Sequence, residues 1–374
     1  MSEWKTYRLG DLCSRIKSGK GIPASEVSTT GEYPVIGGNG IRGYTNTSNF
    51  NGVCAVVGRQ GAYCGNVRFF SGEAYMTEHA VVIVGNELAD TRYLAYLLSI
   101  MQLGHLSAQS AQPGLSVQTL SKLSINIPDI STQRRIAGIL GSLDDKIELN
   151  RRINANLEAQ AQALFRSWFV DFEPFRDGPF VDSELGKIPQ GWEIGTLSEI
   201  ADITMGQSPK GSSYNEEGNG IIFYQGRAEF GNRFPSIRLY TTEPTRIAEI
   251  NSVLLSVRAP VGDINIAKNT CCIGRGLAAI KSKHGCNSFI LYLLQSLKPL
   301  LEQYNGEGTV FGCINRKEIE GLPIIIPKES VINEFEEIVE KIDSEIKNLT
   351  IEQENLSALR DTLLPKLMAG EIKI

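Results

Sequence analysis

The chain has 374 residues, of which 42% are hydrophobic, and a formal net charge of −5 at pH 7. A chain of this length and ordinary composition can bury two cores of common domain size, which excludes a largely disordered protein. The polar first residues and the lack of any apolar run near the ~20 residues that a membrane span needs predict a cytoplasmic protein without signal peptide or membrane segment.

The negative charge is unevenly distributed along the chain. Residues 1–130 carry 10 Lys and Arg against 9 Asp and Glu, and residues 190–328 carry 14 against 13. Residues 329–374 carry 5 against 11. Two long regions are therefore close to neutral, and the overall acidity does not exclude nucleic acid as a partner.

Residues 1–130 alternate short apolar runs with turns of Gly, Asn and Ser, which predicts a mixed, strand-rich domain. Residues 53–57 and 80–84 are typical of strands, and residues 93–101 of a short helix. The sequence GNGIRG, residues 38–43, matches the GxGxxG pattern of dinucleotide sites. No carboxylate occurs between Glu32 and Glu73 and no helix pattern follows, so we interpret this sequence as a turn.

A heptad pattern extends from about Thr132 to Phe169 and predicts a helix of roughly 55 Å. We assign residues 131–175 to this first spacer helix. Asn150 and Asn154 interrupt its apolar stripe, and we hypothesise that they set register or oligomeric choice at some cost in stability. The stripe comprises Ile136, Leu140, Leu143, Ile147, Asn150, Asn154, Leu157, Ala161, Leu164 and Trp168.

Residues 176–189 are rich in Gly, Pro and Asp, which predicts a linker. Residues 190–328 form a second strand-rich domain, with strand patterns at 253–257 and 277–280, and residues 329–374 a second spacer helix. Its stripe lies 199 positions after the first, at Phe335, Val339, Ile342, Ile346, Leu349, Gln353, Leu356, Arg360, Leu363 and Leu367.

The common offset predicts an internal repeat that includes the domains. Trp4 and Trp192 match at an offset of 188, and Tyr96 and Tyr292 at 196, which places insertions inside the domains. Because each helix leaves its domain at its N-terminal end, we expect an α+β fold in which two domains are separated by an antiparallel coiled-coil pair with pseudo-twofold symmetry. Packing of each helix onto its own domain is the alternative.

No catalytic or metal site is expected in this chain. It has no GxxxxGK[ST] segment, no Asn or Asp followed by two prolines and an aromatic residue, and no CxxC pair among its seven cysteines, which we interpret as reduced. Its three histidines lie far apart in the sequence and match no nucleophile or metal pattern.

Gly-rich loops that carry Arg, Gln and Tyr occur in both halves, and the forked side chains of Arg and Gln suit guanine and adenine edges in the major groove. Scattered polar residues in solvated loops are the alternative interpretation. Our candidates for DNA contact in these loops are Arg42, Arg59, Gln60, Tyr63, Gln109, Gln112, Gln207, Arg227 and Arg258. Candidates for phosphate contact, which positions DNA without reading bases, are Lys17, Lys20, Lys210, Arg316 and Lys317.

Four segments resemble the specificity subunits of type I restriction-modification enzymes. They are PDISTQRRIAGIL (128–140), LFRSWFVDFEPF (164–175), IPQGWE (188–193) and LLPKLMAGEI (363–372). The resemblance implies two target recognition domains, each reading one half of a split site in double-stranded DNA, held apart by the spacer helices. It implies a non-catalytic chain without cofactors, two methyltransferase subunits that bind S-adenosylmethionine, and restriction subunits that use ATP and Mg.

Aromatic residues at the end of the first spacer helix suggest a surface for a partner subunit. The candidates are Trp168, Phe169, Phe172 and Phe175. The alternative is that they form a core between helix end and neighbouring domain. Two further functions remain open at this point, which are a recognition subunit of a methylation-only complex and a coiled-coil scaffold that binds protein.

Overall fold

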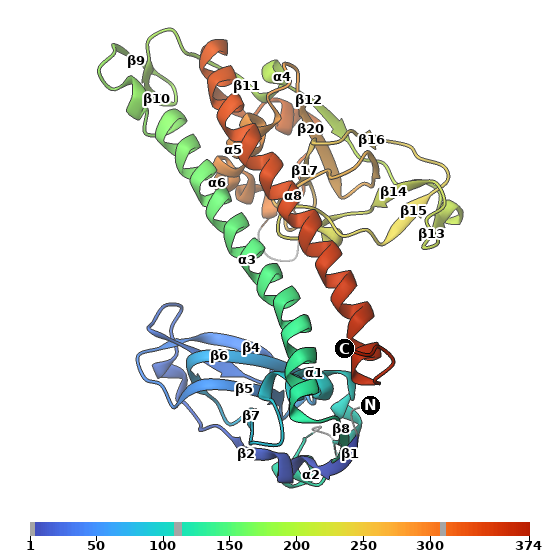
Figure 1. Ribbon diagram of the computed structural model, residues 1–374. Coiled ribbons are helices and arrows are strands. Elements are labelled where there is room, and N and C mark those ends of the chain that lie inside the picture. The colour runs from blue at the N-terminus through green and yellow to red at the C-terminus, as the bar shows by residue number, and fades with distance from the viewer. Residues whose placement is uncertain (1–3, 108–113, 307–311) are drawn as a thin grey trace. The chain divides into compact units, whose positions relative to one another are not determined.

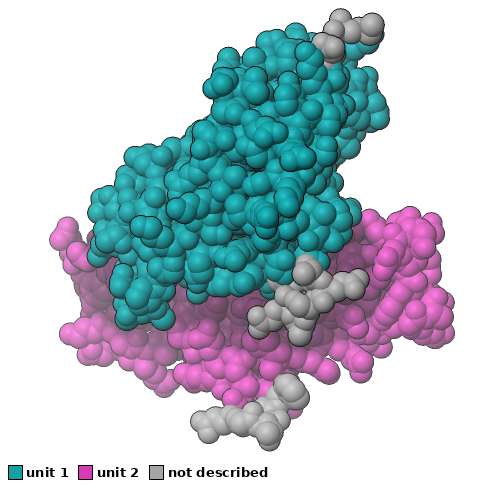
Figure 2. Space-filling view, turned by 90° about the horizontal axis from the view of Figure 1, so that it is seen from below, with its two compact units in different colours: residues 1–151, 351–374 teal, residues 152–350 magenta. Residues whose placement is uncertain are grey.

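The computed structural model describes residues 4–107, 114–306 and 312–374, and Figure 1 labels most of its helices and strands. The chain divides into two compact units, which Figure 2 shows in different colours. Unit 1 comprises residues 1–151 and 351–374, and unit 2 comprises residues 152–350. These units do not end at the predicted domain boundaries, because each contains one globular domain and a part of each long helix.

Unit 1 is built on a six-stranded sheet in the order β2-β7-β5-β6-β3-β4. All neighbours are antiparallel except β3 and β6. The strands are β2 (Cys13–Ser18), β3 (Tyr33–Gly37), β4 (Gly40–Thr45), β5 (Phe50–Gly58), β6 (Val67–Met76) and β7 (Ala80–Gly85). A separate antiparallel pair joins β1 (Lys5–Arg8) to β8 (Ser124–Ile127), and the helices of this domain are α1 (Thr91–Ile100) and α2 (Val117–Ser121).

Unit 2 repeats this topology in two smaller sheets of order β12-β20-β17-β18 and β13-β15-β14-β19-β16. Their strands are β12 (Ala201–Met205), β13 (Tyr214–Asn215), β14 (Ile221–Tyr224), β15 (Leu239–Thr241), β16 (Ile247–Ala248), β17 (Val253–Ser256), β18 (Ile264–Ile266), β19 (Cys271–Ile273) and β20 (Leu277–Ser282). Strand β11 (Glu193–Thr196) pairs with β21 (Pro323–Ile326), and the helices are α4 (Leu197–Ile200), α5 (Asn287–Ser296), α6 (Lys298–Glu302) and α7 (Arg316–Glu320).

The two sheets of unit 2 correspond to the single sheet of unit 1 with two adjacent strands broken, since β16 and β17 take the place of β5, and β18 and β19 that of β6. In unit 1, β6 pairs antiparallel with β5 and parallel with β3. In unit 2, β18 pairs antiparallel with β17, and β19 pairs parallel with β14. The long strand β6 is thus replaced by two short ones, and the α+β fold and internal repeat expected from the sequence are confirmed.

The two long helices are α3 (Ile130–Phe169) and α8 (Glu329–Met368), each of 40 residues. In unit 1, Asn150 donates to Glu352, with the side-chain atoms 2.6 Å apart. In unit 2, Asn154 donates to Thr350 at 3.1 Å, and the rings of Phe165 and Phe335 lie 5.7 Å apart. Residue numbers therefore rise along α3 where they fall along α8, and the helices are antiparallel within each unit.

The predicted linker of residues 176–189 contains a hairpin that the sequence analysis did not predict. Strand β9 (Phe180–Ser183) pairs antiparallel with β10 (Gly186–Pro189), and Gly186 at the turn has a φ of 101°. Its Gly and Pro content, interpreted as a linker signal, instead supports a tight β-turn.

Candidate nucleic-acid interface

Four strands of unit 1 bring their connecting loops to one edge of the sheet. After β2, the backbone N–H of Lys20 donates to the carbonyl of Met76 at 3.0 Å. After β5, the N–H of Arg59 donates to the carbonyl of His79 at 2.9 Å, and the next residue, Gln60, forms an isolated β-bridge with Gly114. Residues 19–20, 38–39, 58–63 and 77–79 thus form a common edge, which we term recognition edge 1.

Two glycines allow the loops of recognition edge 1 to touch. A Cβ atom at Gly58 would lie 2.3 Å from the carbonyl oxygen of Tyr63, and one at Gly38 would lie 3.1 Å from the Cα atom of Gly58. A side chain at Gly58 would therefore displace the loop that presents Gln60.

Cationic side chains lie at the turn between β3 and β4 in the same edge. Gly37 and Gly40 pair across the hairpin. The side chain of Arg42 lies close to Gly37, and that of Arg68 lies close to Gly40. Arg68 also donates to Asn39 at 3.4 Å. Both arginines are exposed, so Arg42 of β4 and Arg68 of β6 present two guanidinium groups beside this turn, suited to phosphate or to a guanine edge.

Unit 2 repeats this edge with the same backbone hydrogen bonds. The N–H of Gln207 donates to the carbonyl of Ile273 at 2.9 Å, as Lys20 does to Met76. The N–H of Val257 donates to the carbonyl of Gly276 at 2.9 Å, and Arg258 forms the isolated bridge to Cys313. Residues 206–207, 225–226, 257–258 and 274–276 therefore form recognition edge 2.

The equivalent positions of the two edges carry different side chains. Lys20 corresponds to Gln207, and Gln60 corresponds to Arg258, since each pair makes the same backbone contacts. All four side chains are exposed. A shared backbone frame thus presents two different sets of hydrogen-bonding groups.

Both halves of the chain match the same known family. The family model of the type I restriction modification DNA specificity domain matches residues 1–159 and again residues 189–360. The chain belongs to the family of type I restriction-modification specificity subunits. The expected resemblance is therefore confirmed over both halves.

Relatives of this specificity subunit cover most of its length. It is 33% identical over 326 residues to the MjaX type I restriction enzyme specificity subunit of Methanocaldococcus jannaschii, which covers 83% of this chain and 76% of the relative. It is 28% identical over 330 residues to the HindI specificity subunit of Haemophilus influenzae, with coverage of 70% and 71%. The crystal structure of the type I S subunit from M. genitalium has the same fold, with a TM-score of 0.69 at 19% identity over 98% of this chain and 96% of that one.

Several predicted DNA contacts of the specificity subunit are already paired with carboxylates. Arg227 contacts Asp263, Arg316 lies 2.6 Å from Glu320, and Lys210 lies 3.9 Å from Glu243. These pairs are partly exposed, so DNA could compete for the cations only after the carboxylates release them. Lys17, Lys20, Arg42, Gln60, Tyr63, Gln207, Arg258 and Lys317 are exposed, and Arg59 is half-buried.

The structure also adds residues that the sequence analysis did not name. Asn39 belongs to recognition edge 1, and the side chain of Arg68 in β6 lies beside it; Gln225 and Arg275 belong to recognition edge 2. Arg275 is exposed, and its backbone N–H donates to Ser208 Oγ at 3.4 Å. Gly274 and Gly276 flank Arg275, and these glycines could have identified it in the sequence as a residue of a Gly-rich loop. The predicted contacts Gln109 and Gln112 lie outside the described residues.

The aromatic residues at the end of α3 pack within unit 2. Phe169 is buried, with ring centroids 5.1 Å from Phe289 and from Phe335. Phe172 and Phe175 are half-buried, and their rings lie 5.6 Å and 5.0 Å from that of Trp192. Burial removes Phe169 from a partner surface. Trp168, Phe172 and Phe175 keep partial exposure, and their interface role stays a prediction.

Several cysteines have thiols whose pKa is raised by burial. Burial raises the pKa of Cys13, Cys54 and Cys271 to about 12 and that of Cys286 to about 11. These thiols are therefore protonated at neutral pH. Among the described residues, no group of His, Cys, Asp and Glu is arranged to hold a metal ion, and no helix is long and apolar enough to cross a membrane.

Proposed function

We propose that this specificity subunit is non-catalytic and that each of its domains reads one half of a bipartite, asymmetric site in double-stranded DNA. The observation that carries this proposal is the pair of recognition edges, which share backbone hydrogen bonds but differ in side chains. Identical edges would read a symmetric site. The change from Gln60 to Arg258 at equivalent positions instead favours adenine contact in one half and guanine contact in the other.

The spacer between the half-sites is assigned to the helix pair. Each helix has 40 residues, which corresponds to about 60 Å of α-helix. Major grooves on one face of B-DNA recur about every 34 Å. A helix pair of this length is sufficient to hold two domains over neighbouring turns of the duplex.

Chemistry is assigned to partner subunits. Two methyltransferase subunits would supply S-adenosylmethionine, and restriction subunits, where present, would supply ATP and Mg. Equivalent surfaces on the two helices support two copies of one partner: Ile139 in α3 and Ile338 in α8, 199 positions apart, are 38% and 42% exposed. Exposed aliphatic side chains at matched positions fit a repeated protein contact. The complex would act on DNA in the cytoplasm.

The proposal is tested by mapping adenine methylation in single DNA molecules from cells with and without this gene, with the neighbouring methyltransferase gene intact. We expect one split, asymmetric motif to lose its methylation on deletion and to regain it on complementation. A lost motif that is contiguous would contradict the two-reader proposal. An unchanged methylome in cells where the complex is expressed would favour the protein-binding scaffold.

A further inference from the structure

The loop between β14 and β15 of unit 2, residues 225–238, contains an insertion relative to unit 1. In unit 1, Tyr33 pairs with Thr45 across the hairpin of β3 and β4, and in unit 2 Ile221 pairs with Thr241. The offset between the units is 188 positions at the first strand (33 to 221) and 196 at the second (45 to 241). The difference, 196 − 188, shows that eight residues are added in this loop, which we term the connecting loop.

The connecting loop starts in recognition edge 2 and is then fixed to strand β18. It begins at Gln225, which contacts Gly274 within the edge. Six residues later, Gly231 both donates to and accepts from the side chain of Asn265, at 3.1 Å and 3.0 Å. Asn265 is 2% exposed. This segment of the loop is therefore held by two hydrogen bonds to a buried side chain.

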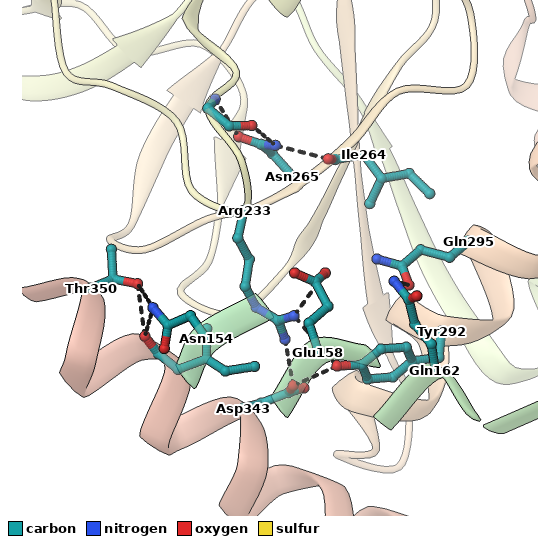
Figure 3. Close-up of polar contacts among 12 residues, drawn as sticks. Asn154, Glu158, Gln162, Arg233, Ile264, Asn265, Tyr292, Gln295, Asp343 and Thr350 are labelled. Carbon is teal, nitrogen blue, oxygen red and sulfur yellow. Dashed lines mark hydrogen bonds and ion pairs between the residues drawn. The ribbon is translucent and has the colours of Figure 1, made fainter. Parts of the chain in front are cut away.

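Arg233 then links the connecting loop to three helices, as Figure 3 shows. Its side chain is 6% exposed. One guanidinium nitrogen lies 3.2 Å from Glu158 of α3 and 3.4 Å from the hydroxyl of Tyr292 of α5. The other donates to Asp343 of α8. A buried guanidinium that loses its carboxylates is strongly disfavoured, so the loop cannot shift along the helices without breaking this network.

Unit 1 contains the same tyrosine and aspartate but obtains its arginine from a different element. Tyr96 of α1 donates to Asp144 of α3. Tyr96 lies 196 positions before Tyr292, and Asp144 lies 199 positions before Asp343. The arginine that binds Asp144 is Arg360, at 2.7 Å, and it lies on helix α8 rather than in a loop between two strands. In the described part of unit 1, the hairpin of recognition edge 1 has only the turn 38–39 between its strands and supplies no such arginine. The direct link from recognition edge to helices is thus a feature of unit 2.

We propose that Arg233 is a positioning residue that fixes the second recognition domain on the helix pair and thereby determines the spacer length at which the second half-site is accepted. This inference rests on the proposed function. One base pair of spacer shifts the second half-site by about 3.4 Å and turns it by roughly 35° about the duplex axis. Discrimination at this scale requires a rigid connection between the reading loops and the helices.

The test measures methylation kcat/KM by the full-length subunit in complex with its methyltransferase. Substrates are duplexes with the native spacer, with the spacer one base pair longer or shorter, and with single substitutions in the second half-site. The variants are Arg233→Met and the charge-balanced triple variant Arg233→Met, Glu158→Gln, Asp343→Asn, which leaves no unpaired buried charge if the single variant fails to fold. Arg360→Met with Asp144→Asn is the matched control in unit 1.

We expect the preference for the native spacer to fall by roughly tenfold in the Arg233 variants, since small displacements of a reading group have large effects on rate. Base discrimination within the second half-site should stay within about twofold, because recognition edge 2 is untouched. The control should retain the spacer preference. A folded Arg233 variant that keeps the native spacer preference, or that loses base discrimination to the same extent, overturns the inference.

Failure of the inference can be distinguished from failure of the proposed function. If the wild-type complex methylates no split site, the proposed function fails and Arg233 has no spacer to determine. If the wild-type complex methylates a split site with a strict spacer and the charge-balanced variant does so equally strictly, the proposed function stands and the role of Arg233 is rejected.

Discussion

The hydroxyl of Tyr292 lies 2.8 Å from Asp343 Oδ1, and Tyr96, 196 positions earlier, donates in the same way to Asp144. Both tyrosines are buried within a domain, and both aspartates lie on a long helix. The internal repeat therefore includes the polar contact between each domain and the helix pair.

Replacement of either tyrosine by phenylalanine should weaken this contact. Tyr292→Phe and Tyr96→Phe each remove the hydrogen bond to a partly buried carboxylate that retains its arginine, and Tyr292→Phe also removes the acceptor of Arg233 at 3.4 Å. We expect a loss of about 1 to 2 kcal/mol in unfolding free energy. Thermal and urea unfolding of each variant measure this loss. Tyr63→Phe, at a hydroxyl on an exposed side chain, should change stability little. Equal stability of all three variants and wild type would show that the tyrosine–aspartate bonds contribute nothing.

Asp129, the residue immediately before α3, should make the folding stability vary with pH in the acid range. Asp129 accepts hydrogen bonds from the backbone N–H groups of Ser131 and Thr132, both at 3.0 Å. The hydroxyl of Ser131 and the other contacts of this cap hold the pKa of Asp129 well below its ordinary value of 3.8. The stabilisation is therefore complete above pH 3.8 and is lost as pH falls through the lowered pKa of the folded state.

Asp129→Ala should accordingly lower the melting temperature near neutral pH, and the difference from wild type should shrink as pH falls below about 4. Asp129→Asn keeps a capping oxygen without a titratable group and serves as the matched control. Melting curves across this pH range measure the effect. A difference between wild type and Asp129→Ala that grows toward acid pH would contradict the assignment of the cap.

The parts of the fold that the sequence predicted are those with local patterns. Helices α3 and α8 follow from heptads, and the internal repeat follows from matches such as Trp4 with Trp192. Both signals come from residues close together in the chain or from direct comparison of its halves. The break of β6 into β18 and β19 depends on pairing between distant strands, which no local pattern records.

The sequence predicted only part of the candidate site, because local patterns do not record contacts between distant segments. Gln60 and Arg258 stand next to conspicuous Gly-rich turns, whereas Arg68 joins recognition edge 1 only through the pairing of β6 with β5 and β3. The contact of Arg233 with the helices gave no signal in the sequence, because its carboxylate partners Glu158 and Asp343 lie 75 and 110 positions away. Such residues are identified only when the fold brings distant segments together.

Asn150 and Asn154, the polar residues in the apolar stripe of α3, should specify how α3 pairs with α8. Asn150 is fully buried and donates to Glu352, while Asn154 donates to Thr350, yet the Oδ1 atom of each asparagine has no partner. We expect the double variant Asn150→Leu, Asn154→Leu to melt at a higher temperature but to form mixed oligomers, because an apolar stripe specifies register less strictly. Calorimetry and light scattering after gel filtration measure both effects. Unchanged melting and assembly would refute this role.

Lengthening both helices should alter the spacer and nothing else. Insertion of two heptads after Arg151 and two after Thr350 adds about 21 Å to each helix, or about six base pairs of DNA. Methylation by the variant complex should require the original half-sites at a longer spacing. Insertion in α3 alone breaks the register of the pair and should abolish assembly. Methylation at the original spacing by the doubly lengthened variant would contradict the spacer role.

The most direct test of the central claim is a single-molecule methylome of cells that carry Gln60→Ala or Arg258→Ala in this specificity subunit. Each truncation would remove the proposed base contact, and a bidentate contact of this kind contributes about 1 to 3 kcal/mol of discrimination. We predict that Gln60→Ala relaxes one half of the split motif and Arg258→Ala the other, with the spacer unchanged in both. If either variant relaxes both halves together, or if both variants relax the same half, the two edges do not read separate half-sites and the account is wrong.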